Sequence, residues 1–559
     1  MTMPLTRFTH RRNSPEAAPL AADARPRLAS GVVFEGAPDE AVRITVLHGV
    51  PTSRVSRTVA ELLTAMDGET ALHDLHQRFA ASESLESFLD LVRRFRANGL
   101  LEGDTKLPPG RITYRPPLTL QLATLRAPGI FDRLDRSMVP VSRRMALIAG
   151  AVLFCLGLVA AILQASELLD VLSAPVPLLG LVSLIAALSI LTLLHESAHG
   201  LTLTRFGGSP RRAGFMLFYL TPAFFVDVTD GWRLPDRRQR VAVALAGPAV
   251  HAVVAAIALV VALILPQPWV RQTLLLLAVA CGGIVLVNLI PFVRFDGYIA
   301  LMSAMDEPNL RDRSIRDGAD FLTRLLFGGQ RTSRCLERWW SVPFGLASLM
   351  APVFLVLFAV SRAVRALAGG GPVLGLLVVA LEAVVVLVGI GIVFRALHRV
   401  LRSGVSRLRF VSVNAALIAS VAIAGALIPV PMTATYGFTA HGDRVLLVHA
   451  GDRAGVEVPA GSRVELMSSG LLVNEQIGAG TTRPRRPQPT EVPLDALVPV
   501  RAHVVSVPAV IVAGVDVSEG SGSLPSTGQA RVDLGVGNLW QTLWVTGVIW
   551  PLSALQIEN

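Results

Sequence analysis

Long apolar runs dominate the middle of the chain. Seven of them occur, at about 145–165, 176–204, 241–264, 271–292, 342–361, 373–395 and 408–428. Each is close to or above the roughly 20 residues that a helix needs to cross a hydrocarbon core of ~30 Å. The pattern therefore predicts seven membrane-spanning helices.

A last run, 534–555, carries no charge and includes Trp540, Trp544 and Trp550. Tryptophan is enriched at membrane–water interfaces. The run is either an eighth span or a helix that lies on the membrane surface, and we favour the span. The chain would then have about seven or eight transmembrane helices.

A small domain is expected ahead of the spans, at 31–104. Strand-like runs at 32–34 and 42–47 precede three stretches with apolar residues at helical spacing. The three stripes are Val59, Leu62, Leu63 and Met66; Leu72, Leu75 and Phe79; and Leu85, Phe88, Leu89, Val92 and Phe95. Asp67-Gly68 and Asn98-Gly99 mark turns. Residues 1–30, rich in Arg, Pro and Ala, should form a flexible start, and the proline-rich region 105–143 a linker.

The pattern changes again after Pro429. Short alternating runs at 444–449, 463–467 and 503–512 are separated by Gly and Pro, which indicates a β-rich domain over 430–533. The fold class is thus an α-helical polytopic membrane protein with a small N-terminal domain and a β-rich C-terminal domain. Between them we expect a transmembrane core at 144–305, a loop with accessory helices at 306–429, and a C-terminal helix at 534–559.

Composition and charge support a membrane protein and set its orientation. Hydrophobic residues make up 52% of the chain and charged residues only 16%, whereas ordinary soluble domains have about 25% charged residues. The net charge of +10 is almost wholly arginine, and arginines cluster in the connections 205–240, 293–341 and 395–409. By the positive-inside rule the N-terminus and these connections are cytoplasmic, and the β-rich domain is extracytoplasmic. Topology explains the charge, so we expect no nucleic-acid partner.

The three cysteines offer no alternative framework. Cys155 and Cys281 lie inside apolar runs and Cys335 lies in an arginine-rich stretch. This scatter predicts neither a disulfide scaffold nor a cysteine-based zinc site.

Ionisable residues stand inside the second apolar run. The segment His195-Glu196-Ser197-Ala198-His199 is an HExxH pattern. On a helix the two histidines project from one face and can bind one Zn²⁺, and Glu196 is placed to take a proton from water at the metal. Charged groups are costly in a span and usually face a polar interior. The alternative is that these side chains are only hydrogen-bonded within a helix bundle.

Two histidines and a water leave a tetrahedral zinc one protein ligand short. The end of the fourth run offers a candidate in Asn288-Leu-Ile-Pro291-Phe-Val-Arg-Phe-Asp296-Gly297. Proline and glycine would let the helix unwind there and bring the Asp296 carboxylate inward, which is tolerated where backbone lines a polar cavity.

Together the two motifs resemble the signature of the site-2 protease family of intramembrane zinc metalloproteases, HExxH followed two spans later by N-x-x-P-x-x-x-x-D-G. The resemblance covers about 176–305. It implies that His195, His199 and Asp296 bind zinc, that Glu196 is the catalytic base, and that Asn288 positions substrate or an oxyanion.

One family element departs from its usual form. Ala246-Gly247-Pro248-Ala249-Val250-His251 has histidine where asparagine is usual. His251 is either a further zinc-competent nitrogen or a packing and hydrogen-bonding residue, and we expect the second role.

A wider segment, 215–311, resembles the peptide zinc metalloproteases that accompany biosynthesis of ribosomally made, modified peptides. The loop 205–240 is too short for an inserted PDZ-like domain, which counts against the branch that cleaves anti-sigma factors. Asp227 and Asp230 in this loop are either additional metal ligands or solvated turn residues, and we expect turn residues.

The N-terminal domain, 31–104, resembles the leader-binding winged-helix (PqqD-like) modules of those pathways. Such modules capture a peptide as an added strand on a sheet edge. A DNA-binding winged helix or a regulatory plug is the alternative reading of this domain.

These observations favour a multi-pass zinc metalloendopeptidase of the plasma membrane that removes the leader from a precursor peptide. One rival is a regulated intramembrane protease that cleaves a membrane-anchored transcription regulator. Another is a non-catalytic peptide-binding or immunity protein, against which the intact Glu196 argues. The expected cofactor is Zn²⁺, and the expected partners are the precursor peptide and the lipid bilayer.

Overall fold

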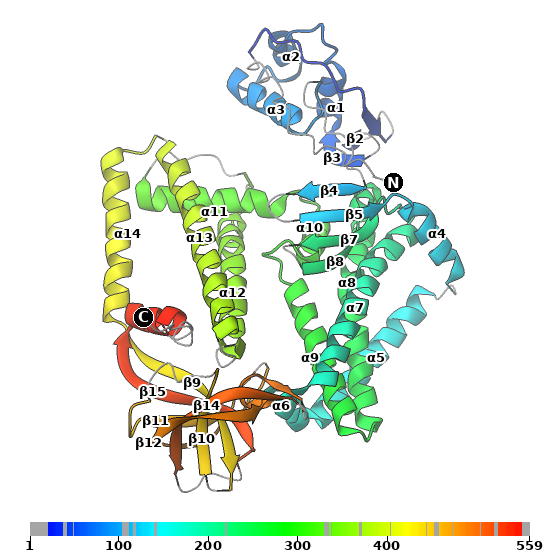
Figure 1. Ribbon diagram of the computed structural model, residues 1–559. Coiled ribbons are helices and arrows are strands. Elements are labelled where there is room, and N and C mark those ends of the chain that lie inside the picture. The colour runs from blue at the N-terminus through cyan, green and yellow to red at the C-terminus, as the bar shows by residue number, and fades with distance from the viewer. Residues whose placement is uncertain are drawn as a thin grey trace, which may run out of the picture. The chain divides into compact units, whose positions relative to one another are not determined.

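The computed structural model divides the chain into two compact units, 1–139 with 192–246 and 140–191 with 247–559. It describes residues 21–36, 42–47, 50–102, 111–115, 119–138, 142–218, 221–328, 335–336, 338–367, 372–402, 404–442, 444–451, 458–471, 473–502, 505–518 and 524–549 (Figure 1). The helices α7 and α8, described below, each cross the boundary between the units.

The first unit begins with a small module of strands and helices. Its elements are β1 (Val32–Glu35), β2 (Val42–Leu47), β3 (Val50–Ser56), α1 (Arg57–Thr64), α2 (Leu72–Phe79) and α3 (Leu85–Ala97). The strands form an antiparallel sheet in the order β1-β2-β3. Ser56 and Ser84 begin α1 and α3, because each serine hydroxyl accepts a hydrogen bond from a backbone N–H of the first turn. Leu63, Leu72 and Phe88 are fully buried among the predicted apolar stripes.

The predicted turns of this module are present. Gly68 and Gly99 both have positive φ angles, 87° and 76°, which glycine adopts without steric cost. Hydrogen bonds from the backbone N–H groups of Thr70 and Glu69 lower the pKa of Asp67 and hold the turn. The likeness to a winged helix stays a prediction.

Two expectations about this module need correction. The sheet has three strands where two were expected: β3, with the sequence Val-Pro-Thr-Ser-Arg-Val-Ser, does not alternate between apolar and polar residues and is extended because it pairs with β2. Part of the segment expected to be flexible, 21–30, packs on the module: Arg27 and Leu28 form β-bridges to Asp67 and Leu101. Residues 1–20 lie outside the described residues.

A four-stranded antiparallel sheet completes the first unit. Its strands are β4 (Ile112–Arg115), β5 (Thr119–Thr124), β7 (Ala213–Phe218) and β8 (Thr221–Val226), in the order β4-β5-β7-β8. Helix α4 (Ala127–Ser137) follows β5, and the short 3₁₀ helix η1 (Thr229–Arg233) follows β8. The expected linker 105–143 therefore contains two strands and a helix. The prolines of this region favoured a linker over the short alternation of Leu120, Gln121 and Leu122. These residues form strand β5 because they pair with β7.

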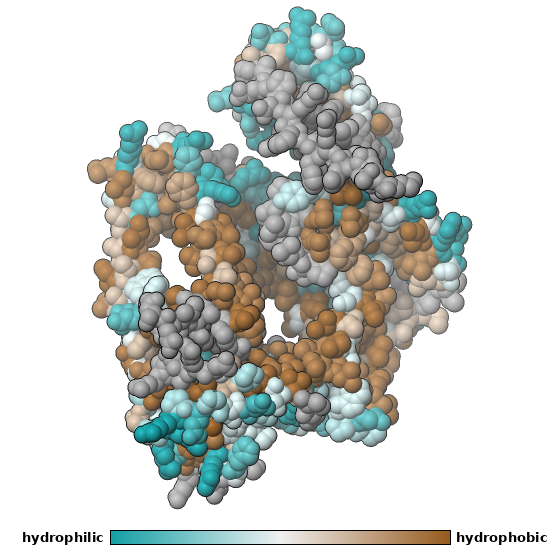
Figure 2. All heavy atoms as spheres, in the orientation of Figure 1, coloured by the Kyte–Doolittle hydropathy of each residue, from teal (hydrophilic) through white to brown (hydrophobic). Residues whose placement is uncertain are grey.

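Seven helices in the described residues are long and apolar enough to cross a membrane, as predicted. They are α5 (Arg143–Leu163), α7 (Leu178–Arg205), α8 (Arg237–Ile264), α9 (Pro268–Asn288), α12 (Ser341–Leu367), α13 (Pro372–Arg402) and α14 (Arg407–Leu427). Shorter helices connect them: α6 (Ala165–Ser173), α10 (Asp296–Met305) and α11 (Leu310–Phe327). Figure 2 shows hydrophobic side chains along α12, α13 and α14 and hydrophilic ones over the C-terminal strands. The chain is a multi-pass membrane protein.

The C-terminal β-rich region is a closed barrel. Its strands are β9 (Pro429–His441), β10 (Arg444–Ala450), β11 (Arg463–Met467), β12 (Gln476–Pro493), β14 (Ser506–Val517) and β15 (Thr527–Asn538), in the order β10-β14-β12-β11-β15-β9. Phe438, Leu447 and Leu466 are fully buried in its core. A 3₁₀ turn, η2 (Leu494–Ala496), precedes β13 (Val500–Arg501), which pairs with β6 (Val176–Pro177) beside α6. The β-rich character is confirmed, and residues 503–504 of the predicted run 503–512 lie outside the described residues.

The expected eighth span is not formed by the described residues. The run 534–555 begins as strand, because Val536, Gly537 and Asn538 pair with β9. The helix that follows, α15 (Leu539–Trp544) with the π-helical turn η3 (Val545–Ile549), has between 10 and 17 residues, short of the roughly 20 that a span needs. Trp540 donates from its indole nitrogen to the Ala422 carbonyl near the end of α14 at 3.1 Å, which holds α15 on that helix. Residues 550–559 lie outside the described residues.

Candidate metal centre

The HExxH segment lies near the C-terminal end of α7. His195 and His199 are buried, at 8% and 6% exposure, and Glu196 is half-buried. The i, i+4 spacing places the two imidazoles on one helix face, as the sequence predicted. Both belong to the first unit, which includes α7 from Thr192 onward.

A backbone carbonyl selects the tautomer of His199. The Nδ1 atom of His199 lies 2.7 Å from the carbonyl oxygen of Val243 on α8. A carbonyl can only accept, so Nδ1 carries the proton and Nε2 keeps its lone pair. Metal-binding histidines are commonly oriented in this way by an acceptor on the second ring nitrogen.

The Nε2 atom of His199 faces the Nε2 atom of His195. The two Nε2 atoms are 3.2 Å apart. In a tetrahedral zinc site with Zn–N bonds of about 2.0–2.1 Å, two ligand nitrogens lie about 3.3–3.4 Å apart. The Nε2 spacing of this pair and the tautomer of His199 fit one Zn²⁺ ion.

The Glu196 carboxylate is held by the sheet. Its Oε2 accepts a hydrogen bond of 3.1 Å from the backbone N–H of Val226, the last residue of β8. β8 is an edge strand, and in the β7–β8 register the hydrogen-bonded pair next to Val226 is Asp227 with Arg212. The Val226 N–H therefore points away from β7, where it can reach a side chain of α7.

Gly200 permits this close packing. A Cβ atom at position 200 would lie 2.6 Å from the Phe131 ring on α4 and 3.0 Å from the Val226 side chain. The bare backbone of α7 directly after His199 is thus the surface on which α4 and β8 rest. A side chain at this position would push β8, and with it the Val226 N–H, away from Glu196.

The second motif lies in the second unit, where the chain turns between two helices. Asn288 is the last residue of α9, and Asp296 is the first residue of α10. A Cβ on Gly297 would lie 2.5 Å from the Leu289 carbonyl oxygen, so glycine lets the start of α10 return against the end of α9. The chain is not helical between Asn288 and Asp296, the stretch that contains Pro291, in agreement with the predicted unwinding.

Arg311 of α11 holds the connection between α9 and α10. Its Nε donates to the Phe292 carbonyl at 2.8 Å, and its Nη2 donates to the Ser348 carbonyl on α12 at 3.1 Å. Burial, followed by repulsion from Arg294, lowers the pKa of Arg311 below its ordinary value. The turn that carries Asp296 is thus attached to two other helices of its unit.

Residues 183–275 match the model of peptidase family M50. The chain contains an M50 domain. M50 peptidases are zinc metalloproteases of the site-2 type, and the matched residues include the whole HExxH segment. The second motif, 288–297, follows the matched segment. No curated protein and no solved structure matches the chain.

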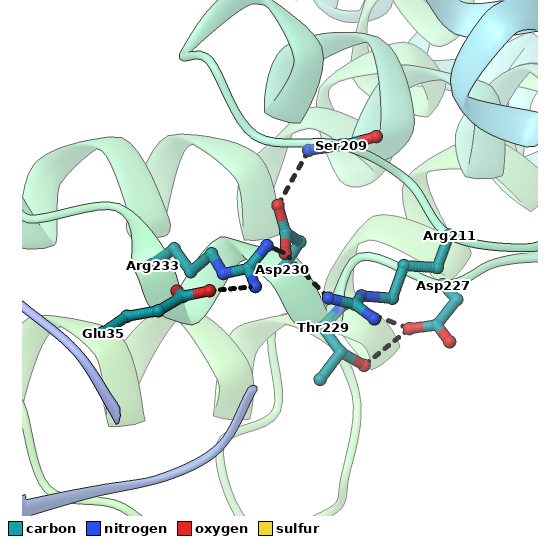
Figure 3. Close-up of polar contacts among 7 residues, drawn as sticks. All are labelled: Glu35, Ser209, Arg211, Asp227, Thr229, Asp230 and Arg233. Atoms are coloured by element: carbon teal, nitrogen blue, oxygen red, sulfur yellow. Dashed lines mark hydrogen bonds and ion pairs between the residues drawn. The ribbon is translucent and has the colours of Figure 1, made fainter. Parts of the chain in front are cut away.

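The two aspartates in the loop of the M50 domain serve the turn after β8 (Figure 3). Asp227 accepts hydrogen bonds from the N–H and hydroxyl of Thr229, at 3.1 and 2.5 Å. Asp230 is buried and accepts from the Ser209 N–H at 2.9 Å and from Arg233 at 2.7 Å. Asp227 is a turn residue, as expected, whereas Asp230 is not solvated as expected: it is buried because Arg233 and the Ser209 N–H bind its carboxylate.

His251 lies on α8, one turn after Pro248, and is buried at 3% exposure. It belongs to the second unit of the chain, whereas His195 and His199 belong to the first. Its expected packing and hydrogen-bonding role stays a prediction.

Sequence reasoning missed the groups that orient the HExxH side chains. The acceptor for His199 is the carbonyl of Val243, and the donor to Glu196 is the N–H of Val226. Backbone groups carry no residue-type signal, so no motif could have named them. The Gly200 position, directly after the motif, was the one available clue to a close neighbour.

Proposed function

We propose that this protein is an intramembrane zinc metallopeptidase that hydrolyses a peptide bond. The observation that carries the proposal is the pair of Nε2 atoms at 3.2 Å, together with the His199 tautomer selected by Val243. A pair of histidines that only filled space would not need its two Nε2 atoms directed to a common point. The M50 domain match supports the same chemistry.

His195, His199 and Asp296 would hold the ion. Two neutral imidazoles and one carboxylate are a common donor set for catalytic zinc, which keeps a position open for water or substrate. When bound, zinc would polarise the scissile carbonyl and lower the pKa of the attacking water. The place of Asp296 in this set rests on its position in the second motif.

Glu196 would act as general base and then as general acid. Its carboxylate accepts a proton from the attacking water and passes it to the leaving amine nitrogen as the C–N bond breaks. The Val226 N–H donates to Oε2 of this carboxylate at 3.1 Å, which fixes the orientation of the base. Asn288, at the end of α9, would position the substrate or the oxyanion.

The proposed substrate is a ribosomally made precursor peptide. Its leader would be removed at an intramembrane site that opens to the cytoplasmic side of the plasma membrane. The N-terminal module supports this substrate, because β1 and β3 are the edge strands of its three-stranded sheet. An edge strand can bind an extended peptide through main-chain hydrogen bonds. Deletion of residues 21–102 should raise KM for the precursor encoded beside the gene and leave zinc content unchanged. An unchanged KM would count against leader capture by this module.

Glu196→Gln tests the catalytic proposal. The amide keeps the shape of the side chain but cannot accept the proton, so hydrolysis should fall by at least about 100-fold while the metal stays bound. Cleavage of fluorescein-labelled casein in detergent and zinc content by mass spectrometry are measured on the same sample. Ser197→Ala, in the same helical turn, is the matched control and should retain both.

The two measurements separate the possible failures. Full turnover in zinc-loaded Glu196→Gln would eliminate Glu196 as the base. Loss of zinc from the same variant would instead assign Glu196 a structural role.

A further inference from the structure

An ionic network connects the N-terminal module to the loop that follows β8 (Figure 3). Its centre is Asp230 on η1, whose side chain is only 5% exposed. Arg233 donates from Nη1 to Asp230 Oδ1 at 2.7 Å, and Arg211 pairs with the same oxygen at 3.4 Å. The Ser209 N–H donates to Asp230 Oδ2 at 2.9 Å.

Arg233 also reaches out of this loop. Its Nη2 lies 2.6 Å from Oε1 of Glu35, the last residue of β1. One guanidinium thus bridges two carboxylates, one in η1 and one in the N-terminal module. A planar guanidinium presents separate donors in fixed directions, which suits it to such a bridge better than a single ammonium group.

The bridged loop is continuous with the strand that holds Glu196. Val226, which donates to Glu196, is followed at once by Asp227, whose N–H donates to the Arg212 carbonyl at 2.7 Å. Asp227 then accepts from Thr229, the first residue of η1. Any shift of η1 is therefore transmitted over a few backbone bonds to the Val226 N–H.

The two ion pairs of Arg233 differ in their expected strength. The Arg233 and Glu35 side chains are 31% and 40% exposed, so their pair should have a small effect, as surface pairs do. Asp230 is almost fully buried, and removal of its partner would leave a poorly compensated carboxylate. Loss of Arg233 should thus disturb the loop more than loss of Glu35.

We propose that Arg233 is a positioning residue that couples docking of the N-terminal module to the orientation of Glu196. It acts through Asp230, the turn at Asp227 and the Val226 N–H, and does not touch the reacting atoms. The inference rests on the proposed role of Glu196 as base. It gives the N-terminal module a second task beside peptide capture, since a docked module would hold the base in place.

The test uses full-length Glu35→Gln, Arg233→Gln and the double variant. Glu61→Gln is the matched control, because Glu61 forms an exposed ion pair within the same module, with Arg57 at 2.8 Å. We measure kcat and KM on fluorescein-labelled casein, zinc content, and hydrogen exchange of the segment 221–233.

We expect kcat to fall about two- to five-fold in Glu35→Gln, the range that a surface ion pair allows. It should fall about ten-fold or more in Arg233→Gln, and Arg233→Lys should recover part of the loss. The double variant should match Arg233→Gln, because both changes interrupt one path. KM and zinc content should stay unchanged, exchange of 221–233 should rise, and Glu61→Gln should behave as wild type.

Two results would overturn the proposal: exchange of 221–233 and kcat both at wild-type values in Glu35→Gln and Arg233→Gln, or losses that simply multiply in the double variant. If Arg233→Gln fails to fold, Glu35→Gln still decides, since its pair is half-exposed. Exchange needs no turnover, so it tests the coupling even if casein is not cleaved. Failure of the catalytic proposal would instead appear as turnover in Glu196→Gln.

Discussion

At the scale of single residues, direct ligands and orienting groups should differ in their effect on the metal. His199 would bind the metal through Nε2, because the Val243 carbonyl holds the proton on Nδ1, and this acceptor is backbone that no substitution removes. Groups that only orient a ligand typically change metal affinity 10–100-fold when altered. Loss of a direct ligand should lower metal affinity at least as much. Metal affinity can therefore distinguish the proposed ligand Asp296 from His251.

We predict that Asp296→Ala lowers zinc affinity by more than about ten-fold, because two imidazoles would then hold the ion without the carboxylate. His251→Asn, which places the residue usual in the site-2 family at this position, should leave affinity unchanged. Zinc is titrated into metal-free protein with a competing chelator. The reverse result, an intact site in Asp296→Ala and an empty one in His251→Asn, would require a new ligand set.

The sequence could identify the HExxH side chains because helix periodicity alone places them on one face. It could not identify their orienting groups, since Val243 lies 44 residues from His199 and Val226 lies 30 residues from Glu196. Such contacts depend on how α8 and β8 pack on α7. The role of Asp296 was inferred from a motif, and it remains a prediction.

At the scale of elements, glycines allow the helices α11 and α12 to approach closely. A Cβ on Gly345 of α12 would overlap the Ser314 carbonyl oxygen of α11, and a Cβ on Gly318 would lie 3.1 Å from the Leu346 nitrogen. The backbones of α11 and α12 are therefore in direct contact. Arg311, which holds the turn before Asp296, lies on this same α11. Separation of the two helices should thus reach the second motif.

We predict that Gly345→Ala destabilises the protein by about 1–3 kcal/mol, the usual cost of forcing an added group into a packed contact. The added methyl must push α11 away from α12. Gly389→Ala is the control: it lies on α13, where an added Cβ would meet no heavy atom within 4 Å, and alanine favours helix over glycine. The melting temperature in detergent should drop only for Gly345→Ala, and equal melting temperatures would contradict a direct backbone contact.

Helices and strands were predictable where a single sequence pattern determines them. The seven spans follow from the length of the apolar runs, and α3 follows from the helical spacing of the apolar residues between Leu85 and Phe95. Strand β3 was not predicted because pairing with β2, rather than its own alternation, holds it extended, and β5 was not predicted because its short alternation lies in a proline-rich segment. The end of β15 was taken for helix because an uncharged run gives no sign of where strand pairing stops.

At the scale of the whole molecule, the second unit supports the predicted membrane orientation of the barrel. The stretch 395–409, which spans the end of α13 and the start of α14, is rich in arginine, and the barrel begins at the other end of α14 (Figure 1). α14 has 21 residues, about 31 Å at 1.5 Å per residue, enough to cross the hydrocarbon core. On the barrel side, β13 pairs with β6, in a connection between spans without basic residues. Basic residues and barrel thus lie at opposite ends of one span, which by the positive-inside rule favours an extracytoplasmic barrel.

We predict that Ser506→Cys in the barrel reacts with a membrane-impermeant maleimide in intact spheroplasts, whereas Ser406→Cys at the start of α14 reacts only after permeabilisation. Both serines are exposed, and both are changed to a residue of nearly equal size. Cys155, Cys281 and Cys335 are replaced by alanine first, so that one thiol reports each position. Labelling of Ser406→Cys before permeabilisation, with Ser506→Cys protected, would invert the orientation. The N-terminal module would then lie outside the cell, where a precursor peptide made in the cytoplasm could not reach it before export, and the leader-removal proposal would fail with the topology.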